Sequence, residues 1–149
     1  MKTRNWILLL LALALVLLGF NMYGAYKKQM AVVRPVPCLD PNVALQQHQH
    51  ATLQIVVDGK IETVPADIGI TEACHFALHT HDATGTLHVE AQDVYPYSLA
   101  DFFRVWQRPL ERQGYSLTIF IDAQEYKGSA EKIVFKDKQQ IILSYVRIP

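Results

Sequence analysis

The first feature of the hydrophobic pattern is a long apolar run near the N-terminus. From Trp6 to Tyr26 the one strongly polar side chain is Asn21. As a helix this run would extend roughly 31 Å, which matches a bilayer core of about 30 Å. The end of the run and the two lysines after it, GFNMYGAYKK, contain no convincing small-x-small cleavage site. We therefore expect an uncleaved signal anchor in residues 1–26, held in the membrane by residues 6–26. A cleaved signal peptide is the alternative.

Prolines indicate an extended stalk after the apolar run. Pro35, Pro37 and Pro41 disfavour regular helix within residues 27–47. A hydrophobic segment close to the N-terminus usually leaves the following chain outside the cytoplasm. The sequence therefore predicts a single-pass protein of the cell membrane. Its stalk carries an extracytoplasmic (periplasmic or extracellular) domain over residues 48–149.

Alternating apolar and polar positions predict a β-hairpin at the start of this domain. In HATLQIVVDGKIETVP, two β-branched runs flank Asp58-Gly59. A two-residue turn would place Ile55 opposite Glu62. A three-residue turn places Ile55 opposite Ile61 and so separates apolar from polar side chains. We expect the three-residue turn.

A helical period follows in YPYSLADFFRVWQRP. Its i, i+3, i+4, i+7 apolar face consists of Leu99, Phe102, Phe103 and Trp106. Ser98 can cap this helix with Asp101 three residues later, and Pro109 ends it. The segments SLTIFIDAQEYKG and KIVFKDKQQIILSYVRI resemble two more hairpins. We expect an α+β fold of mostly antiparallel hairpins with one packed helix.

Histidines are concentrated in a second predicted hairpin, CHFALHTHDATGTLHVEA. If residues 82–85 form its loop, His79 lies directly opposite His88. Directly opposed residues have Cβ atoms about 4.5–5.5 Å apart, so the two imidazoles could hold one ion. By strand alternation, His81 projects from the same face as His79, and Glu90 from the same face as His88.

The first strand of the domain adds histidines to the same polar face if it is a neighbour. With its apolar residues toward the core, its two histidines face the other way. Five of the six histidines then share one face, and His75, with the opposite phase, is the exception. The candidate metal ligands are His79, His88, His81, Glu90, His50 and His48. A solvated sheet face without metal is the alternative.

Imidazole and carboxylate ligands suit copper or zinc, and an extracytoplasmic location adds weight to copper. The methionines Met1, Met22 and Met30 all precede the domain, which argues against a thioether site for Cu(I). Imidazole must be neutral to bind, and its free pKa is about 6.5. We therefore expect the affinity to fall as the pH drops from about 7 toward 5.

The two cysteines predict a disulfide. Cys38 and Cys74 both follow the apolar run, and an even cysteine count in an oxidising compartment most often forms bridges. A pair of thiolate ligands is the alternative, although no C-x-x-C spacing supports it.

Several motifs together resemble a known group of proteins. They are the H-x-H-x-x-L start at His48, the V-D-G-K turn, the P-A-D-I-G-I loop, HTHDATGTLHVE and YSLADFFRVW. In these motifs residues 48–149 resemble a prokaryotic family of small, membrane-anchored, extracytoplasmic proteins. The ending, with a Y-K-G turn and K-D-K-x-x-I-I-L-S-Y, looks like a β-grasp sheet. The resemblance implies an extracytoplasmic, β-grasp-like domain and implies no activity.

Charge and motifs narrow the possible functions. Beyond Lys2 and Arg4, the chain carries 12 Lys and Arg against 14 Asp and Glu. Such a balance argues against nucleic acid as a partner. The sequence contains no G-x-S-x-G, H-E-x-x-H or phosphate-loop motif, so an enzyme is not favoured. The sequence predicts a metal-binding module for copper or zinc capture, delivery or sensing. The alternative is an assembly module that binds a protein partner in a membrane complex.

Overall fold

The computed structural model describes residues 13–22 and 34–149. Residues 13–22 are helical and exposed. The predicted membrane span, residues 6–26, extends on both sides of this helix into residues outside the described ranges. Across the two described ranges, no helix is long and apolar enough to cross a bilayer. The chain divides into two compact units, Met1–Arg34 and Pro35–Pro149, and the second contains the sheet.

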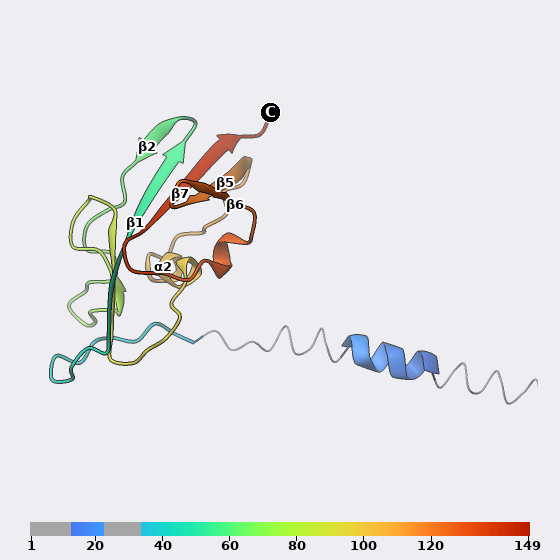
Figure 1. Ribbon diagram of the computed structural model, residues 1–149, viewed down its shortest axis with the longest axis horizontal. Coiled ribbons are helices and arrows are strands. Elements are labelled where there is room, and N and C mark those ends of the chain that lie inside the picture. Colours follow the sequence, from blue (N-terminus) through green and yellow to red (C-terminus); the bar gives the residue numbers. More distant parts are fainter. Residues whose placement is uncertain (1–12, 23–33) are drawn as a thin grey trace, which may run out of the picture. The chain divides into compact units, whose positions relative to one another are not determined.

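A seven-stranded mixed sheet organises the second unit, in the order β3-β4-β1-β7-β5-β6 with β2 paired to β1 (Figure 1). The strands are β1 (Gln47–Val57), β2 (Lys60–Glu62), β3 (Leu78–His79), β4 (Thr86–Ala91), β5 (Tyr115–Ile121), β6 (Gln124–Tyr126) and β7 (Gln139–Arg147). The α+β class is as predicted. The central β1–β7 pair is parallel, however, and all other strand pairs are antiparallel among the described residues. Local hairpin signals could not reveal this pair, because its strands lie at opposite ends of the domain sequence.

The predicted helix and its cap are present. Helix α2 (Leu99–Val105) begins after Ser98, whose Oγ accepts a hydrogen bond from the Asp101 backbone N–H. The Asp101 carboxylate accepts one in return from the Ser98 N–H, at 2.7 Å. This reciprocal capping box satisfies two backbone donors that a helix N-terminus otherwise leaves unpaired. Helix α2 packs beside the 3-10 helix η1 (Ala130–Lys132).

One face of the sheet and the inner face of α2 form the core. The alternating positions of β1, β4 and β7 are buried, as a strand period of two requires. The core side chains of these elements include Leu53, Ile55, Leu87, Val89, Leu99, Phe102, Phe103, Ile141 and Leu143. Because these side chains occupy one face, the intervening residues of β1 and β4 project from the opposite face. That opposite face carries the histidines.

The β1–β2 turn corrects one sequence prediction. It contains two residues, 58–59, and Ile55 pairs with Glu62 instead of Ile61. Glu62 can lie beside the core because it accepts two hydrogen bonds from Arg112, each 2.9 Å long, and also contacts Arg108. The hydrogen bond from Arg112 lowers the pKa of the Glu62 carboxyl below its usual value. Separating apolar from polar residues was the wrong criterion here, because the two arginines neutralise the carboxylate.

The segment KIVFKDKQQIILSYVRI does not form the predicted hairpin, because only its second half is a strand. Residues 132–138 contain the end of η1 and a single bridge from Val134 to Ser98, and no strand. The strand β7 instead pairs with β5 on one side and with β1 on the other. Asp137 and Lys138 form a turn that leads into β7.

Candidate metal centre

Three adjacent strands align the histidines in a row. His79 of β3 pairs with His88 of β4, and His88 pairs in turn with His50 of β1. His48 lies opposite Glu90 in the next cross-strand pair. The sequence-based pairing of His79 with His88 is confirmed. The first strand is the neighbour of β4, which is the condition under which its histidines were expected to share this face. Strand register therefore brings side chains from positions 48 to 90 onto one face.

The turn before β4 sets this register. Gly85 has a φ of +84°, a left-handed conformation that favours glycine, and an added Cβ would lie 2.3 Å from the Leu53 carbonyl oxygen. The Asp82 carboxylate accepts a hydrogen bond from the Thr84 backbone N–H, at 2.9 Å. Asp82 thus acts as a turn former, as residues of this type often do.

The ligand atoms converge into two overlapping sets. In each set the candidate nitrogen and oxygen atoms lie within 4.8 Å of one another. We call the first the inner set, and it consists of His79, His81, His88 and Glu90. We call the second the outer set, and it consists of His48, His50 and His88. Each predicted ligand therefore belongs to a set, and His88 belongs to both.

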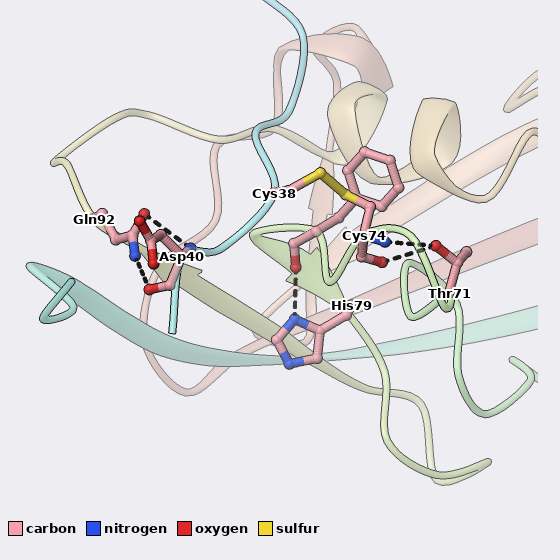
Figure 2. Close-up of a disulfide and its surroundings, with 7 residues drawn as sticks. Cys38, Asp40, Thr71, Cys74, His79 and Gln92 are labelled. Carbon is pink, nitrogen blue, oxygen red and sulfur yellow. Dashed lines mark hydrogen bonds between the residues drawn. A yellow bond between two sulfur atoms is a disulfide. The ribbon is translucent and has the colours of Figure 1, made fainter. Parts of the chain in front are cut away.

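His79 has the most defined environment of the inner set. Its side chain is fully buried, and its Nδ1 lies 3.0 Å from the Phe76 carbonyl oxygen (Figure 2). Because a carbonyl only accepts, Nδ1 carries the proton and Nε2 keeps its lone pair free. A backbone carbonyl that fixes the tautomer in this way is typical of histidines that bind metals.

The free Nε2 of His79 lies 3.2 Å from Nε2 of His81. In the metal-free chain this contact is a hydrogen bond donated by His81. Two nitrogens bound to one zinc ion at tetrahedral geometry would lie roughly 3.3 Å apart. The two rings therefore already stand at the separation that a shared ion requires.

Burial keeps two of the inner imidazoles neutral. Burial, with a smaller contribution from the neighbouring His75, lowers the pKa of His79 from 6.5 to about 4, against the raising effects of its hydrogen bond with Phe76 and of Glu90. Burial likewise lowers the pKa of His88, with contributions from His81 and His50. Both rings are neutral near pH 7, which is the form that binds metal. Protons therefore compete with a metal ion for His79 only at a pH below the range of 7 to 5 that is expected from free imidazole.

His88 and Glu90 connect the two sets. Nδ1 of His88 is buried and has no hydrogen-bond partner among the described residues. The Oε1 atom of Glu90 lies 3.5 Å from this nitrogen and 3.4 Å from Nε2 of His48. A buried nitrogen without a partner is costly in a folded protein, so this position is suited to a ligand.

His75 corrects the prediction that it lies apart from the cluster. Its ring centroid is 4.3 Å from that of His79 and 6.0 Å from that of His81. Strand alternation failed here because β3 begins at Leu78, and His75 precedes it in an isolated bridge to Ile70. The packing of His75, His81 and His88 around His79 also explains why this part of the face is buried and not solvated.

A disulfide joins Cys38 to Cys74, the residue before His75, as the sequence predicted (Figure 2). The Leu39 N–H donates to the His75 carbonyl, and the Ala77 N–H donates to the Pro37 carbonyl. The predicted stalk therefore overlaps the compact unit, since its last residues pair alongside the cluster. The bridge restrains the backbone beneath the inner set.

No protein-family model, curated protein or solved structure matches this chain. The function is therefore inferred from the geometry of the site.

The neutral His79 predicts acid sensitivity of the metal-free fold. The unfolded chain takes up the proton near pH 6.5, whereas the folded chain does so near pH 4. Stability from this group is therefore full above pH 6.5 and decreases by about 3 kcal/mol as the pH falls to 4, with no further loss below. Urea unfolding of the metal-free protein between pH 7 and 4 measures this loss. His79→Asn, which retains a donor but does not titrate, should flatten the profile, and an unchanged profile would contradict the assignment.

Proposed function

We propose that this protein is a membrane-anchored, extracytoplasmic module that binds one Cu(II) or Zn(II) ion for capture, delivery or sensing. The observation that carries the proposal is the inner set. Three imidazoles and one carboxylate converge there, with His79 buried, neutral and held in the tautomer that leaves Nε2 free. A solvated face of unrelated histidines would not need this arrangement.

The charge of the ligands supports a single ion. The two sets contain one carboxylate, Glu90, and five imidazoles that are neutral as ligands. Two divalent ions about 5 Å apart would repel each other by roughly 13 kcal/mol at an effective dielectric constant of about 20. One carboxylate offsets little of this repulsion. We therefore expect a stoichiometry of one.

The chemistry of the ligands supports copper or zinc. Imidazole with carboxylate suits both Zn(II) and Cu(II), and Cu(II) generally binds nitrogen sites more tightly. All three methionines precede residue 34, so the domain supplies no thioether for Cu(I). The paired cysteines supply no thiolate.

Two observations support the location. The disulfide is typical of an oxidising compartment. In the described helix, residues 13–22, the Asn21 amide donates to the Leu17 carbonyl at 3.2 Å, while its large apolar side chains are exposed. Satisfying the one polar side chain internally suits an apolar surrounding. We propose that residues 6–26 anchor the chain and that residues 48–149 form a β-grasp-like member of the family they resemble.

Metal analysis of the full chain in detergent tests the proposal. The protein is purified without a histidine tag, loaded with Cu(II) or Zn(II) at pH 7, desalted and analysed for metal content. We expect about one ion per chain for at least one metal. If neither ion binds with a dissociation constant below about 10 μM, corresponding to about 7 kcal/mol, the proposal is wrong. The assembly module that binds a protein partner would then be the better explanation.

A further inference from the structure

One half of strand β5 has no neighbouring strand on its outer side within the part of the chain that the structure describes. The short strand β6, at the end of the sheet, pairs only with residues 119–121 of β5 (Figure 1). Residues 115–118 are paired with β7 on their inner side. A strand edge with open backbone groups is a template on which another strand can pair.

The hydrogen bonds of the backbone show which groups face this open edge. Asp122, the residue after β5, donates its N–H to the Gln140 carbonyl of β7. Because the direction of these groups alternates along an antiparallel strand, the even-numbered residues of β5 face β7 and the odd-numbered residues face away. Leu117 therefore directs both its N–H and its carbonyl to the open edge. Neither group has a hydrogen-bond partner among residues 34–149.

A cleft of about 440 Å³ lies beside Leu117 on the core face of the sheet, a volume within the range of ligand-binding clefts. Strand β5 lines it on one side and residues 128–131 on the other. In the register of β6, Gly128 would lie opposite Leu117, but the pairing ends at Tyr126. Because Leu117 and Gly128 both line the cleft, the cleft takes the place of the pairing that β6 does not continue.

The cleft is apolar inside and acidic at its rim. Its charged lining residues are Glu111, Glu131 and Arg112, and both glutamates are exposed. The charge of Arg112 is offset, because its guanidinium donates two hydrogen bonds of 2.9 Å to the Glu62 carboxylate. The apolar lining includes Leu110, Leu117 and Ile119. The surface therefore suits an apolar side chain flanked by positive charge.

We propose that the edge of β5 at Leu117 and the cleft beside it bind an extended segment of a partner protein as an added strand. One residue of the segment exchanges two backbone hydrogen bonds with Leu117 and places an apolar side chain in the cleft. Side chains two residues away lie on the same face, so basic residues there meet Glu111 and Glu131. The inference is independent of the metal site, which lies on the other face of the sheet.

Nuclear magnetic resonance of the isotope-labelled full chain in detergent, with a chelator present, tests the proposal. The probe is a capped pentapeptide of lysine, threonine, leucine, threonine and lysine. We expect a dissociation constant below about 1 mM. The bound peptide should slow hydrogen exchange of the Leu117 amide at least about tenfold, and should leave that of Thr118, which faces β7, unchanged. N-methylation of the central leucine should weaken binding about fivefold, because it removes the donor to the Leu117 carbonyl.

Charge reversal tests the rim of the cleft. Glu111→Lys and Glu131→Lys should each weaken binding of the peptide about threefold. Both variants should bind more tightly a second peptide that has glutamates in place of the lysines. The matched control is Glu72→Lys, which reverses an exposed carboxylate outside the cleft and should bind as wild type does.

Four outcomes would overturn the proposal. A Leu117 amide that is already protected in the free chain would show that the edge is closed, and protection that grows with protein concentration would make a second copy the occupant. Absence of binding at about 1 mM would show that the cleft does not take such a segment. Binding that is unaffected by N-methylation would show that a side chain enters the cleft without strand pairing.

Discussion

Replacing His79 or His88 with alanine should weaken binding of Cu(II) or Zn(II) by at least about 100-fold. Mutating residues that only orient metal ligands already costs roughly 10- to 100-fold, and these two side chains are proposed to be ligands. The double variant should lose little more than either single variant, because the two rings act on one ion. Calorimetric titration of the full chain with each metal measures the affinities.

Two controls make this result specific. Gln54→Ala should bind as wild type does, since Gln54 lies on the same sheet face outside both sets. His75→Ala should have an intermediate effect, because its ring packs on His79 at 4.3 Å without belonging to either set. The assignment would be wrong if His75→Ala weakened binding more than His79→Ala. Unfolding curves of each metal-free variant verify that the fold is retained.

Replacing both cysteines, as Cys38→Ala/Cys74→Ala, should lower the free energy of unfolding by about 4 kcal/mol. The bridge closes a loop with a sequence separation of 36, and such a loop restricts the unfolded chain by about that amount in the chain-entropy model. Denaturant unfolding of the oxidised wild type and the double variant measures the difference. The wild type in reductant should match the variant, and a loss below about 1 kcal/mol would contradict the prediction.

The same variant should also affect the metal site to a smaller extent. The bridge holds Cys74 next to His75, and His75 packs against His79. Without the covalent link, the segment around His75 is held to the segment around Cys38 by backbone hydrogen bonds, such as the one from the Leu39 N–H to the His75 carbonyl. We expect weaker metal binding with unchanged stoichiometry, because no ligand has been removed.

The sequence was sufficient for the parts of the site that depend on local strand geometry. The pairing of His79 with His88 follows from alternation and from the length of the DATG turn. The helix cap at Ser98 follows from residue spacing, and the disulfide from the even cysteine count. Each of these depends on residues close in sequence or on a single possible partner.

The errors arose where distant segments decide the local structure. Ile55 pairs with Glu62 because arginines from beyond α2 neutralise that carboxylate. His75 joins the cluster because its backbone bridges to Ile70 and not to a regular strand. The burial of His79 arises from three other rings that pack around it. Alternation along one strand contains no information on any of these contacts.

The parallel pairing of β1 with β7 determines when the domain can fold during synthesis. The histidines of both sets lie on β1, β3 and β4 or, for His81, directly after β3; these segments leave the ribosome early, whereas β7 is the last strand of this sheet to be made. Until β7 arrives, β1 has an open edge and its apolar face is incompletely covered. Such long-range pairing also slows folding, because much of the chain must be ordered before the contacts form. A chain cut short before residue 139 would therefore carry every histidine and still lack the strand that holds their sheet together.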